Sequence, residues 1–510
     1  MLAVALAAGA GAAFAVPAQA GTPAPASRFS GPMVRAVVVV HDDVQLPLAV
    51  PGGRVVTAFP HVGSELVVAP LSALHSLAGD PAVAGVSPDR SGRVAGHSFS
   101  GGPGVLAPVS LGGDAGTTGT GYHVNVALLD TGVSDTPALN RASGRITDGV
   151  DVSRLAKGGE ARTSGRFTDG YGHGTFLASL IAGGKVRGSG DRAIGVAPSA
   201  RIVVVKVADS RGRTTLSQVL AGMDWVAAHA QAIQVVNVAL AVDRPTAPAY
   251  GADPLTAAIE HVRASGVLPV VAAGNSRNEV GDPGMDPQAL TVGAADVQRH
   301  PVRPATFSGR GIVAGVEKPD VVAPGVHVLG VMPAGSYIYR SHPEGRQSDG
   351  LFRGSGTSEA TAIASGVVAA YVSKHLDAAP KQVKAAVRDA ARDLHKSGSG
   401  QGLVQMVGSD GATAPESDAG ESRFDAKSWN DNAWQQGDWV DWLASSWSGP
   451  AWDASSWSAS SWSASSWSAS SWSASSWSAS SWSASSWSAS SWSASSWSAS
   501  SWSAYQWGGR

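Results

Sequence analysis

The chain has 510 residues, no cysteine, a formal net charge of −2 at pH 7 and a hydrophobic content of 43%. This length allows two or more folded units, and the charge offers no basic footprint, so we expect no nucleic-acid partner. Without cysteine the chain contains neither disulfides nor thiolate metal sites.

The first residues predict export from the cell. Residues 2–16 form an apolar, alanine-rich run, and Ala18-Gln19-Ala20 follows it as a small-x-small pattern. This arrangement is typical of a secretory signal peptide, here over residues 1–20. No Lys or Arg precedes the run, so a start farther upstream, a weak signal or a buried alanine-rich helix stay open as alternatives. Residues 21–30 are rich in Pro, Ala and Ser and are predicted to be disordered.

Residues 31–90 predict a small α+β domain of the ferredoxin-like kind. Leucines at helical spacing predict a helix over 70–77. Runs of β-branched or apolar residues predict strands at 34–40, 55–59, 65–68 and 83–86. Residues 91–117 are rich in Gly, Ser and Pro, so we expect a linker that contains a proteolytic maturation site.

Residues 118–407 predict an α/β domain, because strands and helices alternate along them. Buried-type strands are predicted at 124–129, 202–207, 235–240 and 267–272, and helices at 175–182, 214–230, 254–265 and 380–394. This order favours a mostly parallel sheet covered by helices. Functional groups in such sheets gather beyond the carboxyl ends of the strands, where Asp130 and Asn275 lie.

Three stretches of this domain carry candidate chemistry. They are VALLDTGV at 126–133, DGYGHGTFLASLIAG at 169–183 and LFRGSGTSEATAIASG at 351–366. An acyl-transfer enzyme needs a hydroxyl nucleophile, an imidazole that moves its proton, and a carboxylate that orients the imidazole. Ser358, His173 and Asp130 supply these groups, and Asn275 can supply an amide N–H for the oxyanion.

Each of these four residues also has a simpler interpretation. Ser358 could be a helix cap, Asp130 and Asn275 could form turns, and His173 could be a surface loop residue. A chance occurrence of all four in the order Asp, His, Asn, Ser is improbable, so we interpret them as one site.

These motifs resemble those of the subtilisin-like serine peptidases, the subtilases, over residues 118–407. Further matches are VVAAGNS at 270–276, FSGRG at 307–311 and KPDVVAPG at 318–325. The resemblance implies a subtilisin-like fold, with Asp130, His173 and Ser358 as catalytic triad and Asn275 in the oxyanion hole. Residues 31–90, ending in PAVAGVSPDR, look like the family's inhibitory propeptide. We therefore expect a secreted precursor of the actinobacterial type, inhibited in cis, that cleaves protein or peptide substrates as a monomer.

The sequence also departs from the family pattern. Glu359 follows the nucleophile position where the family usually has Met, and Ala362-Ile363 replaces a common Pro-His. Ala239, Leu240 and Ala241 stand at the substrate-lining Ser-Leu-Gly segment, and Gly274 is the other residue assigned to substrate binding. No organic cofactor is expected. The family implies that structural calcium could bind, but no ligand set has convincing spacing, so no metal is assigned.

The last part of the chain is a repeat. After an acidic, polar linker at 408–428, Trp recurs at intervals of five residues within 429–510, regularly from Trp442 to Trp507. On a helix, a period of five residues rotates successive Trp side chains by about 140° around the axis, and on a strand it places them on alternate faces. Neither element would gather the Trp residues on one apolar face. We therefore favour a disordered, low-complexity tail. The alternative is a multivalent stacking platform for cell-wall glycan or for other tails, which would place the enzyme at the cell wall.

A second hypothesis for the whole chain comes from this tail. The protein would be a cell-surface binding protein whose protease-like domain is inactive and whose tail is the functional part.

Overall fold

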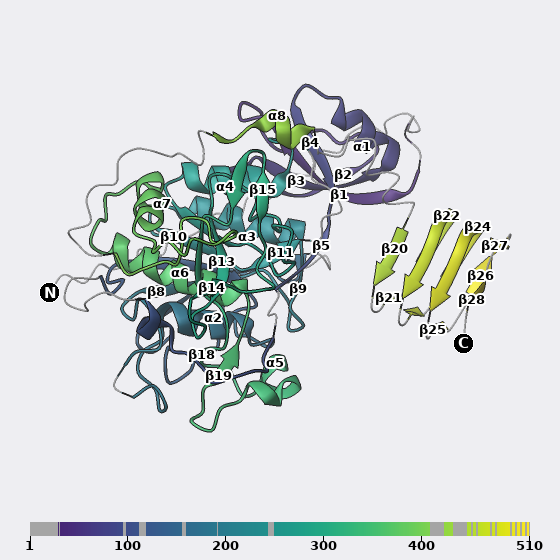
Figure 1. Cartoon of the computed structure of the whole chain (residues 1–510). Coiled ribbons are helices and arrows are strands. Elements are labelled where there is room, and N and C mark those ends of the chain that lie inside the picture. The colour runs from purple at the N-terminus through teal and green to yellow at the C-terminus, as the bar shows by residue number, and fades with distance from the viewer. Residues whose placement is uncertain are drawn as a thin grey trace.

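The computed structural model describes three bodies of structure (Figure 1). It describes residues 29, 31–94, 98–111, 119–155, 160–190, 192–242, 249–407 and 423–431, and strand segments between 446 and 508. The predicted signal peptide and most of residues 21–30 and 408–428 lie outside these ranges. Within the described part of the chain, no helix is long and apolar enough to cross a membrane.

The N-terminal domain, residues 31–90, is the predicted small α+β unit. Its four strands form an antiparallel sheet in the order β2-β3-β1-β4, with one helix, α1, on one face. The elements are β1 Met33–Val40, β2 Arg54–Phe59, the 3-10 turn η1 Pro60–Val62, β3 Ser64–Pro70, α1 Leu71–Ala78 and β4 Val83–Pro88.

Both faces of this small sheet are buried, which explains why β1 ends in four consecutive valines. Val38 faces α1, where it packs with Leu74. Val37, one residue earlier and therefore on the opposite face, belongs to a core that it shares with Leu255 and Ile259 of the next domain. The N-terminal domain is thus docked through its sheet.

The central domain, residues 119–407, is built on an eight-stranded sheet in the order β14-β13-β12-β10-β6-β8-β7, with β17 beside β13. Every pair is parallel except β13 with β14, as the βαβ pattern predicts. The strands are β6 Asn125–Asp130, β7 Ile146–Asp151, β8 Arg201–Lys206, β10 Val235–Val238, β12 Leu268–Ala272, β13 Leu290–Asp296, β14 Arg303–Pro304 and β17 Val321–Pro324.

Helices cover both faces of the central sheet. The helices α2 His173–Ala182 and α6 Thr357–Val372 pack in one core, and α3 Leu216–Ala228 and α4 Pro254–Ala264 in the other. Every residue of α6 is buried. Its many alanines and its Gly366 allow this, because small side chains let a helix lie against neighbours on all sides. Asp253 and Pro254 start α4 as predicted, with the Asp253 carboxylate accepting from the Thr256 N–H.

Shorter elements complete the structure of residues 91–407. The helices are α5 Tyr337–Ser341 and α7 Pro380–Asp389, and 3-10 turns lie at η2 Ala107–Ser110 and η4 Pro343–Gly345. The strands are β5 Ser91–Val94, β9 Arg213–Thr215, β11 Leu240–Val242, β15 Gly311–Val313, β16 Val316–Lys318, β18 Val328–Gly330 and β19 Phe352–Gly354. Helix α7 ends five residues before the predicted limit of 394.

The predicted linker at 91–117 is held against the central domain wherever it is described. Strand β5 pairs with β11 and β9. Farther along, Ser98 bridges Ser355 and Val105 bridges Val328. Leu111 is fully buried in the central core. The Gly/Ser/Pro-rich composition predicted a linker free of the domain. Extended chain that lies against a domain has the same composition, so composition alone could not tell the two apart.

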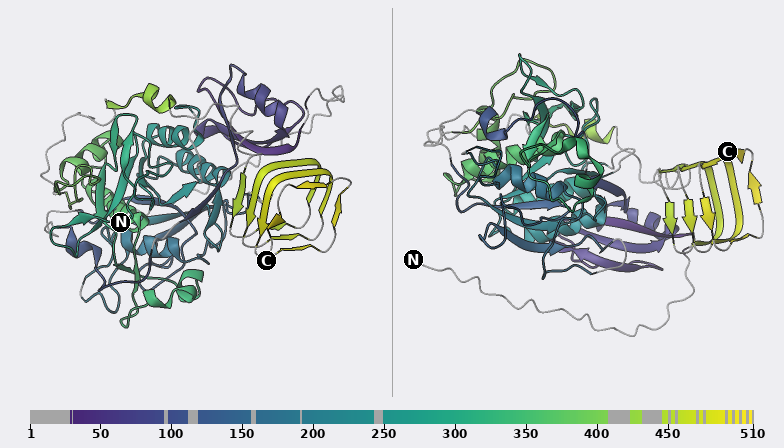
Figure 2. Two further views of the ribbon diagram at one scale, coloured as in Figure 1. Left: turned by 45° about the vertical axis from the view of Figure 1, so that its right-hand side comes forward. Right: turned by 90° about the horizontal axis from the view of Figure 1, so that it is seen from below.

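The prediction of a disordered tail is wrong for the described strands. Strands of the repeat pair in parallel with those twenty residues farther on, for example Trp457 with Trp477 and Trp467 with Trp487. Four pentapeptides therefore make one turn, and the strands curve round into a loop set apart from the other domains (Figure 2). The periodicity argument considered one helix or strand by itself, whereas the described strands pair with repeats twenty residues farther along the chain.

The strands of this coil are short except for two. They are β20 Ser446–Gly449, β21 Trp452–Ala454, β22 Trp457–Ala469, β23 Trp472–Ala474, β24 Trp477–Ala489, β25 Trp492–Ala494, β26 Trp497–Ala499, β27 Trp502–Ala504 and β28 Trp507–Gly508.

Trp429 does not belong to the tail, contrary to the predicted boundary. It lies on α8, Ala426–Asn430, and is only 5% exposed. Its ring packs against Tyr250 and Phe424, and the Asp425 N–H donates to the carbonyl of Ala314. The tail is therefore tied to the central domain before the repeat begins.

Candidate active site

Asp130 ends β6 at the carboxyl edge of the sheet and is completely buried. Its Oδ1 accepts from the backbone N–H and the hydroxyl of Thr131, at 2.8 and 3.1 Å. Gly132 then turns the chain with φ +101°, and a Cβ there would lie 2.5 Å from the carbonyl oxygen of Phe167. The Thr-Gly turn predicted from sequence thus fixes this carboxylate.

His173 is the first residue of α2, two residues earlier than the helix start predicted at 175. Its Nδ1 lies 2.9 and 2.8 Å from the two carboxylate oxygens of Asp130. Since both partners are buried, this contact fixes the ring and places the proton on Nδ1. Nε2 is buried and has no hydrogen-bond partner among the described residues.

Asp169 organises the turn between these two residues and was missed by the sequence analysis. Oδ1 accepts from the Thr131 hydroxyl and from the backbone N–H groups of Tyr171 and Gly172, at 2.8, 3.0 and 2.6 Å. Oδ2 accepts from the N–H and the hydroxyl of Thr175, both at 2.8 Å. One carboxylate therefore joins the Asp130 turn to the start of α2.

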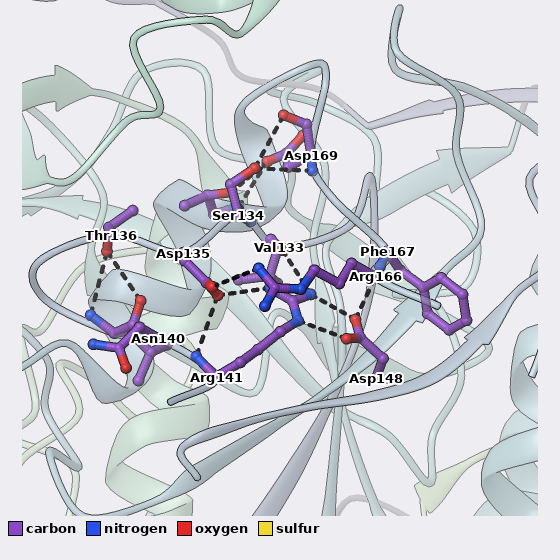
Figure 3. Close-up of polar contacts among 12 residues, drawn as sticks. Val133, Ser134, Asp135, Thr136, Asn140, Arg141, Asp148, Arg166, Phe167 and Asp169 are labelled. Atoms are coloured by element: carbon purple, nitrogen blue, oxygen red, sulfur yellow. Dashed lines mark hydrogen bonds and ion pairs between the residues drawn. The ribbon is translucent and has the colours of Figure 1, made fainter. Parts of the chain in front are cut away.

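The surrounding loop is cross-linked by further charges (Figure 3). Arg141 forms ion pairs with Asp135 and Asp148, at 2.8 and 2.5 Å. Asp169 donates its backbone N–H to the Ser134 hydroxyl at 3.1 Å. The sequence signal for Asp169 is its place four residues before His173, but a polar residue in a glycine-rich loop reads equally as a turn former.

Ser358 is the second residue of α6 and is buried. Its Oγ donates to the carbonyl oxygen of Ala239 at 3.3 Å. Nε2 of His173 has no hydrogen-bond partner among the described residues, so no hydrogen bond joins it to Ser358 in this state. Such contacts often tighten only when substrate binds.

Asn275 is oriented by the same helix terminus. Its Oδ1 accepts from the backbone N–H and hydroxyl of Thr357, at 3.0 and 3.1 Å. Binding the amide oxygen turns the Nδ2 group away from Thr357. Gly274 before it has φ +90°, and its carbonyl accepts from the Gly309 N–H at 2.7 Å.

The predicted substrate-lining segment is occupied by the chain itself. Leu240 and Ala241 of β11 pair antiparallel with Val94 and Arg93 of β5. On its other side β5 pairs with β9. A peptide strand between two strands is the geometry of β-augmentation, in which main-chain bonds hold an extended peptide.

Charges around His173 shift its titration. Burial alone would lower the pKa of His173, but the charge and hydrogen bond of Asp130, with a smaller contribution from Glu359, raise it above the ordinary value. Burial raises the pKa of Glu359 to about 7, against the opposing attraction of His173.

The described residues contain no group of three or more His, Cys, Asp or Glu side chains arranged to hold a metal ion. Subtilisin relatives commonly bind structural calcium. No calcium ligands are assigned in the described part of this chain.

A buried Asp–His pair beside a helix-terminal serine, at the carboxyl edge of a parallel sheet, defines the class of serine hydrolases. Residues 121–409 match the model of the subtilase family of peptidases, and the chain belongs to that family of subtilisin-like serine endopeptidases.

Individual relatives agree with this assignment. The serine protease AprX of Bacillus subtilis is 33% identical over 282 residues, which cover 53% of this chain and 61% of AprX. Subtilisin BL of Lederbergia lenta is 32% identical over 59% of this chain and 94% of its own. Fervidolysin from Fervidobacterium pennivorans, a keratinolytic enzyme related to subtilisin, superposes with a TM-score of 0.54 at 21% identity, over 76% of this chain and 61% of its own. This structural likeness concerns the fold alone.

Proposed function

We propose that the protein is a secreted serine endopeptidase, made as an inhibited precursor. The observation that carries the proposal is the pair of short contacts between buried Asp130 and Nδ1 of His173, next to the α6 terminus that holds Ser358. Ser358 is the nucleophile, His173 the general base and acid, and Asp130 the orienting carboxylate.

The reaction uses these groups in two halves. Ser358 Oγ attacks the peptide carbonyl carbon while its proton passes to Nε2 of His173. The oxyanion receives hydrogen bonds from the Asn275 amide and from the Ser358 backbone N–H at the start of α6. The C–N bond breaks as His173 returns the proton to the leaving amine, and water then hydrolyses the acyl-enzyme by the same proton transfers.

A fluorophosphonate probe tests this mechanism directly. The matured protein should become labelled at Ser358 and should hydrolyse a soluble peptide, and Ser358→Ala should lose both activities while keeping its circular dichroism spectrum. An unlabelled, inactive but folded wild-type protein would instead support the second hypothesis, an inactive domain that serves binding.

We also propose that residues 31–90 inhibit the enzyme in cis, with the help of β5, which directly follows them. Two contacts favour this role: Asp89 accepts from the N–H and hydroxyl of Ser217 at the start of α3, both at 2.9 Å, and β5 occupies the substrate-lining strand β11. Arg90 is buried between Asp253 and Asp282, at 3.3 and 3.5 Å. These contacts hold β5 in register.

Maturation is then expected between Val94 and Ser98. Val94 pairs with Leu240, and Ser98 bridges Ser355, three residues before Ser358. The Ser358→Ala protein should stay uncut, and the matured wild type should begin within this interval. An identical processed N-terminus in both proteins would assign the cut to an outside protease.

The tail supports a proposal about location. Its register places Trp positions above one another at each twenty-residue turn, so a ligand that binds one indole meets the same group at a regular spacing. Cell-wall glycan is the partner we propose, held by many weak contacts. Secretion and action as a monomer remain part of the same proposal.

A further inference from the structure

Glu359 is a buried carboxyl beside the candidate nucleophile that the mechanism above does not use. It is the third residue of α6, directly after Ser358, and is 1% exposed. A Cβ atom at Gly354 would lie 2.6 Å from its Oε1 and 2.8 Å from the Phe176 ring. The side chain therefore fills the space over Gly354 of β19, next to the helix that begins with His173.

The hydrogen bonding of this carboxyl is incomplete. It accepts from its own backbone N–H, but Oε2 is buried without a hydrogen-bond partner in the described part of the chain. Nε2 of His173 is in the same condition. A buried, half-satisfied carboxyl is destabilising unless a nearby charge compensates for it.

The charged groups around Glu359 leave one compensating partner. From α2, His173 attracts its charge, and from β6, Asp130 repels it. Arg353 on β19 is directed elsewhere, because its guanidinium donates to the carbonyl oxygens of Phe99, Gly102 and Glu344. Asp169 acts on His173 from the loop before α2. Among these groups, the His173 imidazole is the one whose positive charge would favour ionised Glu359.

We propose that Glu359 is a positioning residue that raises the proton affinity of His173 through its negative charge and thereby sets the pH at which the enzyme becomes active. This inference rests on the proposed function. The two groups share protons: the imidazolium favours ionised Glu359, and ionised Glu359 favours the imidazolium. Their titrations are therefore coupled, and the acidic limb of the pH profile belongs to the pair.

The chemistry gives this charge a use. His173 becomes an imidazolium in the tetrahedral intermediate, and a second carboxylate near Asp130 stabilises it. Because burial holds the pKa of Glu359 near 7, that stabilisation is present above neutral pH and fades below it. Neutral His173 is the form that accepts the Ser358 proton. With Glu359 present, His173 loses its own proton only at a higher pH than it would in a protein without this carboxyl.

The test compares matured wild type, Glu359→Gln and Asp377→Asn. Gln keeps the size of the side chain and removes its charge, and Asp377 is an exposed carboxylate between α6 and α7 that serves as control. We measure kcat/KM on a soluble peptide from about pH 5 to 10. The midpoint of the acidic limb should fall by roughly one pH unit in Glu359→Gln, the scale expected when a neighbouring opposite charge is lost. Asp377→Asn should overlay wild type. Overlapping profiles for wild type and Glu359→Gln would overturn the inference.

Two further measurements keep the proposal testable if Glu359→Gln does not fold. Glu359→Met places the residue usual in the family at this position and should shift the limb in the same direction. In the full-length Ser358→Ala protein, NMR titration of labelled His and Glu should show a His173 curve with two steps, one of them at the Glu359 midpoint. A single, independent step would refute the coupling. This titration needs no turnover, so it tests the coupling of Glu359 and His173 even if the protein is not a peptidase. Failure of the proposed function would instead be seen as an inactive wild type.

Discussion

Asp169→Asn is the sharpest test of how the site is held together. The Asp169 carboxylate accepts five hydrogen bonds from Thr131, Tyr171, Gly172 and Thr175. All five partners are donors, and three of them are backbone N–H groups that cannot rotate. An amide in place of the carboxylate keeps one accepting oxygen but turns its NH2 group toward donors.

The magnitude follows from the bonds that must be lost. If the amide oxygen of the variant still accepts from the Gly172 N–H, its NH2 group faces the N–H and the hydroxyl of Thr175, which are donors too. Each buried donor left without a partner costs about 1–3 kcal/mol, so the loss is roughly 3 kcal/mol. For a domain of roughly 290 residues with an unfolding entropy of about 2.1 cal/mol/K per residue, this lowers Tm by about 5 °C. Displacement of His173 should also reduce kcat, by about tenfold to a hundredfold.

Scanning calorimetry on the Ser358→Ala background, which prevents self-digestion, measures the first quantity, and peptide hydrolysis by the active form measures the second. Asp135→Asn is the matched control, because Asp135 is more exposed and pairs with Arg141 and Arg166 at the surface. Its loss should cost less than about 1 kcal/mol. Equal Tm values for the Asp169 and Asp135 variants would refute the view that Asp169 joins the two turns.

Three further predictions concern other parts of the chain. Asn275→Ala should lower kcat by about a hundredfold to a thousandfold with little change in KM, measured by steady-state kinetics, since one oxyanion donor is lost; an unchanged kcat would remove Asn275 from the site. Burial raises the pKa of Glu65 in β3 to about 7, so the folded N-terminal domain should lose up to ~3 kcal/mol of stability as pH rises from about 4.5 to 7. Urea unfolding of Glu65→Gln should not show this loss. An equal pH dependence of unfolding in wild type and Glu65→Gln would contradict the prediction. Truncation after Asp431 should leave the Tm unchanged and peptide hydrolysis within about twofold, but it should reduce retention on isolated wall glycan, as loss of multivalency requires. Truncation after Val407 should also lower the Tm, because it removes the buried Trp429. Undiminished retention on the glycan would exclude anchoring by the tail.

The parts of the fold that could be predicted are those whose pattern reports burial directly. Strands β6, β8, β10 and β12 are short apolar runs, and α4 carries both its cap and its first-turn proline in the sequence. Strands β7 and β13 were missed, because Thr, Asp and Gly interrupt them. Their place is set by pairing with β8 and β12, which no local pattern contains.

The same distinction applies to the site. Asp130, His173, Asn275 and Ser358 are found through motifs, and the structure brings Asp130 into contact with His173 and Asn275 into contact with the start of α6. The second layer was not foreseen. Asp169 and Glu359 act through partners remote in sequence or through burial, and a single carboxyl in a loop or first helical turn has more common explanations.

Asp169 and Glu359 also show why two buried carboxyls near one imidazole need different surroundings. Asp169 is satisfied by five donors, which stabilise its negative charge, so its main role is to fix geometry. Glu359 has an oxygen without a hydrogen-bond partner among the described residues, and its charge is therefore available to influence His173. Full satisfaction gives a rigid support, and incomplete satisfaction gives a group whose protonation responds to its neighbour. A buried carboxyl with incomplete hydrogen bonding next to the candidate nucleophile costs folding stability, and a Met at position 359 would stabilise the fold better. The presence of Glu359 is therefore better explained by control of the proton affinity of His173.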